Sequence, residues 1–240
     1  AGDGSVGLET GQSESGSRDA VKRAGAAVQD NLATWPVAAA ALERSVPDSH
    51  RGRFLGQHPV PSRSADRAAV QLDPGVAFGS GSHPSTRLCL LWLERVIQGG
   101  ASVLDYGCGS GILAITAAKL GAGAVVGVDI DPQALEVAKV NSSANGVDAS
   151  YTDSHGLSQR ATTFDVVLAN ILSNPLKLLA PVLVARVAPR GSLVLSGILE
   201  RQAEAVIATY LRTDANLQLG VWRREDGWVC LVGRRTRMAH

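Results

Sequence analysis

The sequence predicts an α/β protein built on a mostly parallel β-sheet that ends in an antiparallel C-terminal hairpin. From residue 102 onward, short apolar runs rich in β-branched residues alternate with helical segments, of which the first two end at Gly121 and Gly146. This alternation is typical of right-handed βαβ units and a parallel sheet. The last two apolar runs, 217–225 and 228–235, are separated only by Asp226-Gly227, a pair that favours a tight hairpin. The final strand must therefore run antiparallel to its neighbour.

The sequence of the first half of this region predicts two βα units. The apolar run SVLDYGCGSG (102–111) predicts a buried strand followed by a glycine turn. Asp131 before Pro132 is typical of a helix N-cap and first helical position, and Gly146 of a helix end. The expected elements are a strand at 102–106, a helix at 112–120, a strand at 124–131, a helix at 132–145 and a weak strand near 149–151.

The second half continues the alternation. FDVVLANIL (164–172) and GSLVLSGIL (191–199) are β-rich, and ERQAEAVIATYLR (200–212) follows as a helix. The intervening segment, 175–188, predicts a helix, and Pro181 within it predicts a bend or a break. This half therefore supplies two further parallel strands before the hairpin.

Composition divides the chain near residue 71. Residues 1–17 are rich in Gly, Ser and small polar residues, and 45–67 combine prolines and arginines without apolar periodicity. We expect 1–71 to be a disordered or poorly structured extension and linker, and 72–240 to be the folded domain.

The bulk properties exclude several classes of protein. The formal net charge of +1 gives no electrostatic footprint for nucleic acid or a membrane surface. The apolar runs are all shorter than the roughly 20 residues that span a bilayer. Three irregularly spaced cysteines form no C-x-x-C pair, and no secretory signal opens the sequence. We therefore expect free thiols, no metal site and a cytoplasmic protein.

The glycine loop after the first strand predicts a cofactor site. Glycines there allow positive φ and close approach of a ligand to the backbone. The spacing from Gly107 through Gly109 to Gly111 is G-x-G-x-G, and Asp105 precedes it. An acid in this position suits a ligand that carries an ammonium group, such as S-adenosylmethionine, better than a pyrophosphate. A nicotinamide-dependent dehydrogenase is disfavoured because its loop is G-x-G-x-x-G.

Asp129 and Asn170 complete the candidate site. Asp129 ends the second strand, where a carboxylate can accept both ribose hydroxyls. Asp131 is its rival, although its expected role is to cap the next helix. Asn170 ends the third clear strand, at the carboxyl edge where α/β proteins bind ligands, and can accept from an amine. Its alternative role is a turn residue that bonds its own backbone.

The motif LDPGVAFGSGSHPSTRLCLLWLE (72–94), together with VLDYGCGSGILAI, VVGVDIDPQALEVAKVN, ANILSNPLKLLAP and WVCLVGR, resembles the lysine methyltransferases of ribosomal protein L11. The resemblance covers about 72–235, and its G-x-G-x-H-P-[ST]-T element is its most specific part. It implies a Rossmann-like class I methyltransferase. It also implies that Thr86, Gly107, Asp129 and Asn170 contact S-adenosylmethionine.

The function implied by this resemblance is methyl transfer from S-adenosylmethionine to a protein amine. The implied substrate is a lysine of ribosomal protein L11, with no direct nucleic-acid or membrane partner. Family members carry an N-terminal recognition domain, whereas residues 1–71 are short and polar for that role. Another protein lysine, a small amine, or a truncated cofactor-binding protein without catalysis therefore remain as alternatives. His83 either ties down its loop or accepts a proton.

Overall fold

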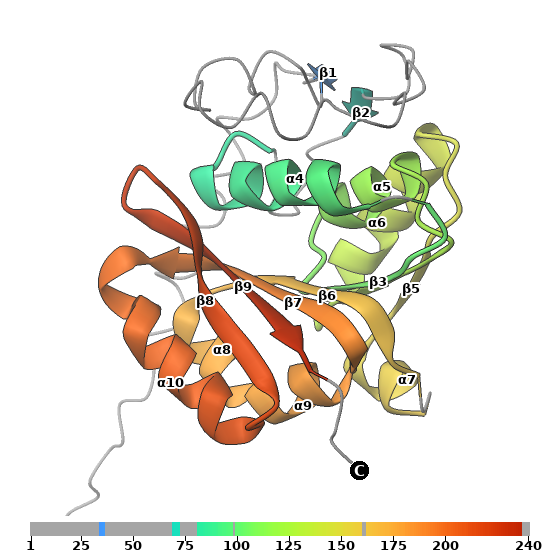
Figure 1. Cartoon of the computed structure of the whole chain (residues 1–240). Helices are drawn as coiled ribbons and strands as arrows, with labels where there is room; N and C mark the ends of the chain where they lie inside the picture. The colour runs from blue at the N-terminus through green and yellow to red at the C-terminus, as the bar shows by residue number, and fades with distance from the viewer. Residues whose placement is uncertain (1–33, 37–68, 73–80, 98, 160–161, 237–240) are drawn as a thin grey trace, which may run out of the picture. The chain divides into compact units, whose positions relative to one another are not determined.

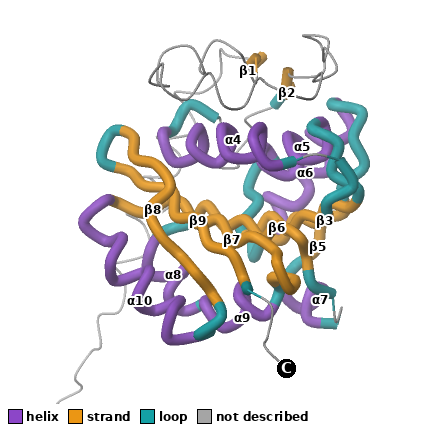
Figure 2. The backbone as a smooth tube through the Cα atoms, viewed as in Figure 1, coloured by secondary structure: helices purple, strands orange, loops and turns teal. Residues whose placement is uncertain are grey.

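A computed structural model describes residues 34–36, 69–72, 81–97, 99–159 and 162–236. They include a seven-stranded sheet with helices on both faces (Figures 1 and 2). Its order is β5 (Ser150–Thr152), β4 (Ala124–Val128), β3 (Ser102–Tyr106), β6 (Phe164–Asn170), β7 (Val187–Leu199), β9 (Trp228–Arg235) and β8 (Leu217–Glu225). The first five strands of this order, from β5 through β4, β3 and β6 to β7, are parallel to one another. Strand β9 is antiparallel to both β7 and β8. The predicted fold class is confirmed.

The helices form a layer on each side of the sheet (Figure 1). One side carries α4 (Pro84–Val96), α5 (Ile112–Lys119) and α6 (Pro132–Ala144). The other side carries α7 (Ser154–Ser158), α8 (Ser173–Leu178), α9 (Ala180–Ala185) and α10 (Ala203–Thr213). A 3₁₀ turn at Glu200–Gln202 precedes α10. The predicted break near Pro181 is confirmed, because α8 and α9 are separate helices. Helix α7 was not predicted; Asp153 caps it by accepting a hydrogen bond from Gly156 N at 2.7 Å.

Two apolar cores lie on opposite faces of the sheet. Leu104 and Tyr106 of β3 pack in the core that contains α8 to α10, whereas Val103 packs in the core beneath α4 and α5. Successive side chains of a strand point to opposite faces. Asp105 therefore shares the face of Val103, beneath α5.

Part of the region before residue 72 is also described. Strands β1 (Thr34–Pro36) and β2 (Ala69–Gln71) pair antiparallel. Gln71 exchanges two hydrogen bonds with the side chain of Asn145, and Val70 and Leu72 are buried in the core beneath α4 and α5. The rest of the extension expected over 1–71 lies outside the described residues.

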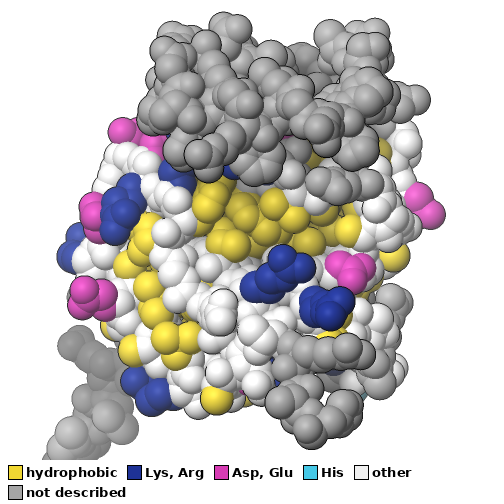
Figure 3. All heavy atoms as spheres, in the orientation of Figure 1, with side chains coloured by type: hydrophobic (Ala, Val, Ile, Leu, Met, Phe, Trp, Pro, Cys, Tyr) yellow, Lys and Arg dark blue, Asp and Glu magenta, His cyan; other side chains and the backbone are white. Residues whose placement is uncertain are grey.

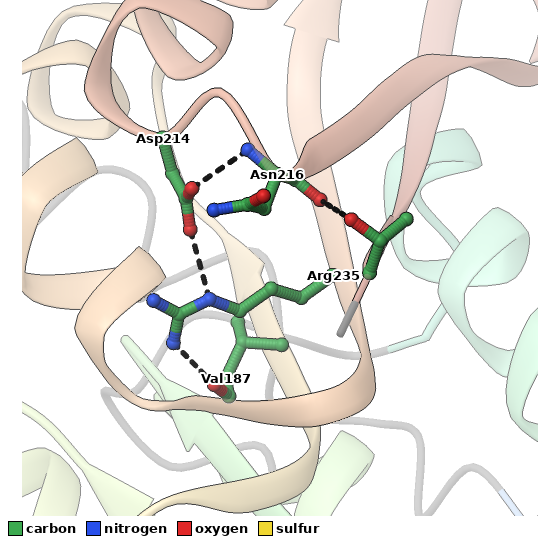
Figure 4. Close-up of polar contacts among 5 residues, drawn as sticks. Val187, Asp214, Asn216 and Arg235 are labelled. Atoms are coloured by element: carbon green, nitrogen blue, oxygen red, sulfur yellow. Dashed lines mark hydrogen bonds and ion pairs between the residues drawn. The ribbon is translucent and has the colours of Figure 1, made fainter. Parts of the chain in front are cut away.

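A polar network fastens the far end of the hairpin, away from its turn (Figure 4). Arg235 Nε lies 2.8 Å from Asp214 Oδ2, and Arg235 Nη1 donates to Val187 O at 3.0 Å. Asp214 Oδ1 accepts from Asn216 N at 2.8 Å. The start of β8 and the end of β9 are thereby tied to the start of β7.

One face of the molecule carries apolar side chains between α4 and the hairpin (Figure 3). A shallow hollow of about 530 Å³ lies there, lined by Trp92 and Val96 of α4 and by Leu219 and Val232 of the hairpin, among others. Charges of both signs are scattered over this face. No helix within the described residues is long and apolar enough to cross a membrane.

Candidate functional site

A cavity of about 520 Å³ opens at the carboxyl edge of the parallel strands. Strands β3, β4, β6 and β7 end there, and β9 begins there because it runs in the opposite direction. The lining residues are His83, Ser85, Tyr106, Gly107, Gly109, Asp129, Ile130, Asn170, Ile171, Leu172, Pro175, Leu179, Gly197 and Trp228. Four of the residues expected from the sequence, Gly107, Gly109, Asp129 and Asn170, thus share one cavity.

The glycine loop needs its glycines for both conformation and space. Gly107, Gly109 and Gly111 have φ values of 80°, 52° and 81°, in the left-handed region that disfavours other residues. A Cβ on Gly107 would collide with the side chain of Ile171. A Cβ on Gly111 would lie 2.9 Å from the hydroxyl of Tyr151. The loop therefore presents backbone, without side chains, to the cavity.

Most backbone amides of this loop donate hydrogen bonds to acceptors within the protein. Gly109 N donates to Asp129 Oδ2 at 2.9 Å, and Ala114 N donates to Asp105 Oδ2 at 3.1 Å. The amides of Gly107 and Cys108 donate to Val128 O, and that of Gly111 to Cys108 O. A phosphate cradle needs such amides to point at the ligand. The loop therefore does not fit a pyrophosphate.

Asp129 is held at the end of β4 by backbone donors on both of its oxygens. Oδ2 accepts from Gly109 N, and Oδ1 accepts from Asp131 N at 3.1 Å. Each carboxylate oxygen has a second lone pair, so both can still accept from a diol at the cavity. Asp131 is exposed and its Oδ1 accepts from Gln133 N at 2.9 Å, which confirms the expected helix cap.

Asp105 lies beneath the loop and does not line the cavity. It is 1% exposed, and its Oδ1 is a buried oxygen with no hydrogen-bond partner. Burial raises the pKa of Asp105 to about 7, the bond from Ala114 N opposes this, and the nearby Asp129 charge adds to it. The strand alternation that directs Tyr106 into the cavity directs Asp105 under α5, and this explains its position.

Asn170 and Thr86 meet across 84 residues of sequence. Asn170 Nδ2 donates to Thr86 Oγ1 at 3.1 Å, from the end of β6 to the first turn of α4. Thr86 is 2% exposed and does not line the cavity, whereas Asn170 does. With its amino group directed at Thr86, Asn170 keeps Oδ1 as its acceptor.

His83 serves α4 and also forms part of the cavity wall. Its Nδ1 accepts from Ser85 N at 3.3 Å and lies 2.7 Å from Ser85 Oγ, which makes it the N-cap of α4. Its ring meets Trp228 edge to face, with centroids 4.5 Å apart. The expected role of His83 in tying down the loop is confirmed.

Several cavity residues were not predicted from the sequence. Trp228 comes from the first position of β9, and Gly197 from a bulge in β7 with φ of 79°. An isolated glycine within a strand pattern was the available signal for that bulge. Trp228 had no local signal, because its place in the cavity depends on the pairing of β9 with β7.

The charge and shape of the site suit a cationic ligand that carries a diol. Burial raises the pKa values of Tyr106 and Cys108, and the nearby charge of Asp129 adds to both shifts. The Asp129 carboxylate beside the loop favours a cation. The carboxylate of Asp129 and the side-chain-free Gly107, which both line the cavity, therefore fit S-adenosylmethionine. Among the described residues, no group of three or more His, Cys, Asp or Glu could hold a metal ion.

Comparisons with known proteins agree with this geometry. The model of the ribosomal protein L11 methyltransferase (PrmA) family matches residues 53–236. The ribosomal protein L11 methyltransferase of Cupriavidus metallidurans is 56% identical over 170 residues, which are 71% of this chain and 54% of that protein. The Ralstonia pickettii enzyme is 58% identical over 168 residues, 70% of this chain and 55% of that protein.

The chain thus spans about half the length of these curated relatives. The crystal structure of ribosomal protein L11 methylase from Lactobacillus delbrueckii subsp. bulgaricus superposes with a TM-score of 0.66 at 33% identity. That match covers 76% of this chain and 91% of the other. The fold, the glycine loop and these matches together show that the chain belongs to the ribosomal protein L11 methyltransferase family.

Proposed function

We propose that this chain binds S-adenosylmethionine in the cavity and transfers its methyl group to a protein amine, a lysine of ribosomal protein L11. The observation that carries the proposal is the meeting of Gly107, Asp129 and Asn170 in one cavity. Membership of the family supplies the substrate class.

In this proposal the cofactor lies over the ends of β3 and β4. Asp129 accepts the ribose hydroxyls with the lone pairs that Gly109 N and Asp131 N leave available. Gly107 and Gly109 let the ligand approach the backbone. Asp105, buried below, favours the positive end of the ligand when its carboxyl group is ionised. When bound, S-adenosylmethionine supplies an electrophilic methyl group.

Asn170 orients the nucleophile. A lysine amine has an ordinary pKa near 10.4 and must lose a proton before it can attack. The apolar side chains of Ile171, Leu172 and Pro175 beside Asn170 desolvate the amine, which lowers its pKa. Asn170 Oδ1 accepts an N–H of the neutral amine, and Thr86 holds the amide in that orientation. Water takes the proton, and positioning supplies most of the rate gain.

We also infer that residues 72–240, together with β2, which packs against them through Val70, form the catalytic unit, and that this unit acts in the cytoplasm. The three cysteines Cys89, Cys108 and Cys230 are buried free thiols, which suits a reducing compartment. A ribosomal protein as substrate belongs in the same compartment.

The test is to incubate the chain with methyl-labelled S-adenosylmethionine and unmethylated ribosomal protein L11, and to locate the label by mass spectrometry. N-acetyl-lysine methylamide serves as a small-amine acceptor, and the Asp129→Ala variant as the cofactor-binding control. We expect label on L11 lysines. Label on the small amine alone would reassign the substrate. Cofactor binding without transfer to either acceptor would mean that the chain is a non-catalytic cofactor-binding protein.

A further inference from the structure

An aromatic wall of two residues lines the cavity, and one of them comes from β9, four strand positions away from β4 and Asp129. Its two members are His83, which caps α4, and Trp228, which opens β9. Their rings are edge to face, with centroids 4.5 Å apart and planes at 73°, and both line the cavity. Such a pair gives the cavity a rigid, electron-rich surface.

The hairpin turn fixes where Trp228 lies. Asp226 and Gly227 both have positive φ, as a two-residue type I′ turn requires. Trp228 pairs with Glu225 across the turn and with Leu199 on β7, while Gly227 O accepts from Glu200 N at 2.9 Å. The backbone of Trp228 is therefore held from both of its neighbouring strands.

An ion pair fastens this turn to the helix that carries His83. Arg87 of α4 pairs with Glu225, and the Arg87 amide also donates to His83 O at 3.1 Å. The Glu225 side chain is 18% exposed and that of Arg87 is 40% exposed, so the pair is partly shielded from solvent. A second ion pair joins Arg224 of the hairpin to Glu200 of the 3₁₀ turn after β7, but both of its side chains are more than half exposed.

The strand order puts this wall on the substrate side of the cavity. Across the sheet, Asp129 ends β4, Gly107 follows β3, Asn170 ends β6, Gly197 lies in β7 and Trp228 starts β9. Neighbouring strands are about 4.8 Å apart, so Trp228 lies about three strand spacings beyond the glycine loop. A cofactor held by Asp129 and Gly107 leaves the end beyond Asn170 for the amine.

We propose that Trp228 contacts the substrate and sets its specificity: its indole packs against the alkyl stem of the incoming amine and holds the methylated ammonium product by a cation–π contact. His83 braces the indole, and Arg87 and Glu225 are positioning residues that hold the wall together. The proposal rests on the proposed methylation of an amine and names the group that selects it.

The first experiment measures binding and does not depend on turnover. N-acetyl-lysine methylamide and its trimethyl-lysine analogue are titrated into the chain with S-adenosylhomocysteine present. The indole N–H resonances are followed by NMR, and Trp228→Phe identifies the resonance of Trp228. We expect that resonance to shift, the trimethylated probe to bind more tightly, and Trp228→Leu to weaken binding about tenfold, against less than threefold for Trp228→Phe. An unmoved Trp228 resonance, or equal binding to Trp228→Leu, would overturn the proposal.

The second experiment separates KM from kcat, with L11 as the acceptor. We expect Trp228→Leu to raise the KM for L11 about fivefold to twentyfold, with cofactor affinity within twofold of wild type. Glu225→Gln and Arg87→Met should give a smaller rise, and the matched variant Arg224→Met none. An equal loss of cofactor affinity in Trp228→Leu would assign Trp228 to the cofactor and overturn the proposal. If wild type binds cofactor but transfers nothing, the proposed function fails, and the NMR titration still decides the role of Trp228.

Discussion

The two ends of the cavity are built in different ways. The loop end comes from one continuous stretch, 105–129, in which a strand, a turn, a helix and a second strand bring Gly107, Gly109 and Asp129 together. The other end is assembled from α4, β6, β7 and β9, which are far apart in the sequence. The first end depends on local conformation and the second on tertiary pairing. Substitutions at the first should change cofactor affinity, and substitutions at the second should change turnover or the KM for the amine substrate.

Ile171 joins the two ends. Its side chain fills the space that a Cβ on Gly107 would occupy, and its backbone fills the space that a Cβ on Gly197 would occupy. The glycine loop and the β7 bulge therefore both lie against this residue. The tight contact explains why both neighbours are glycines with positive φ, at 80° and 79°.

The largest expected effect is at the loop end, in Gly107→Val. The valine side chain would collide with Ile171, and the backbone at this position has a positive φ that valine disfavours. We therefore expect cofactor binding to fall below detection in isothermal calorimetry. Gly100→Val is the matched control, since Gly100 has a φ of 72° but nothing within 4 Å of its ideal Cβ. The control should lose stability and keep its affinity. Unchanged affinity in a folded Gly107→Val would move the cofactor elsewhere.

Next in size is Asn170→Ala, at the other end. Loss of its acceptor leaves the amine poorly oriented, so we expect turnover to fall about tenfold to a thousandfold while cofactor affinity changes by less than about tenfold. Steady-state kinetics and calorimetry together measure both quantities. Thr86→Val, which removes the partner of Asn170 Nδ2, should give a smaller loss of the same kind. Abolished cofactor binding would assign Asn170 to the cofactor alone, and wild-type turnover would remove it from the active site.

How far each end could be predicted follows from the same difference. The alternation of strands and helices, the glycine turn and an acid at the end of the second strand are local sequence patterns. The fold and the loop end could therefore be predicted from the sequence. Trp228 enters the cavity because β9 inserts between β7 and β8, a pairing that no local pattern specifies. Asp105 is an intermediate case: its strand is evident from the sequence, whereas its place beneath α5 follows from which face of that strand it occupies in the folded sheet. Asn170 was found through its position at a strand end, whereas its bond to Thr86 required the folded structure.

Asp105→Asn tests the loop end through pH. The pKa of Asp105 is about 7 in the folded protein and near 3.9 when unfolded. Between these values the folded state retains a proton that the unfolded state has lost, so stability falls as pH rises from about 4 to 7 and then levels off. The contribution lost is roughly 2–4 kcal/mol. Chemical denaturation at several pH values should show this fall in wild type and its absence in Asp105→Asn.

The same titration should affect cofactor binding in the opposite sense. Ionised Asp105 attracts a cationic ligand, so affinity should rise as pH increases through about 7. Because titration of the ligand itself is common to both proteins, the difference between wild type and Asp105→Asn isolates this residue. Identical pH profiles for affinity would show that Asp105 has no electrostatic influence on the ligand.

The smallest of these effects is Asp129→Ala. The substitution removes both acceptors for the ribose hydroxyls, and hydrogen bonds to a charged group contribute about 1.5–3 kcal/mol, so calorimetry should show cofactor affinity reduced by about that amount. Asp131→Ala is the matched control two residues away. It should reduce stability by about 1 kcal/mol, because Asp131 caps α6, and leave affinity unchanged.

Because Asp129 also accepts hydrogen bonds from Gly109 N and Asp131 N, the stability of Asp129→Ala must be measured by denaturation alongside its cofactor affinity. If Asp129→Ala and Asp131→Ala lost the same cofactor affinity, the loop end would be sensitive to the capping of α6. Asp129 would then make no contact of its own with the ligand.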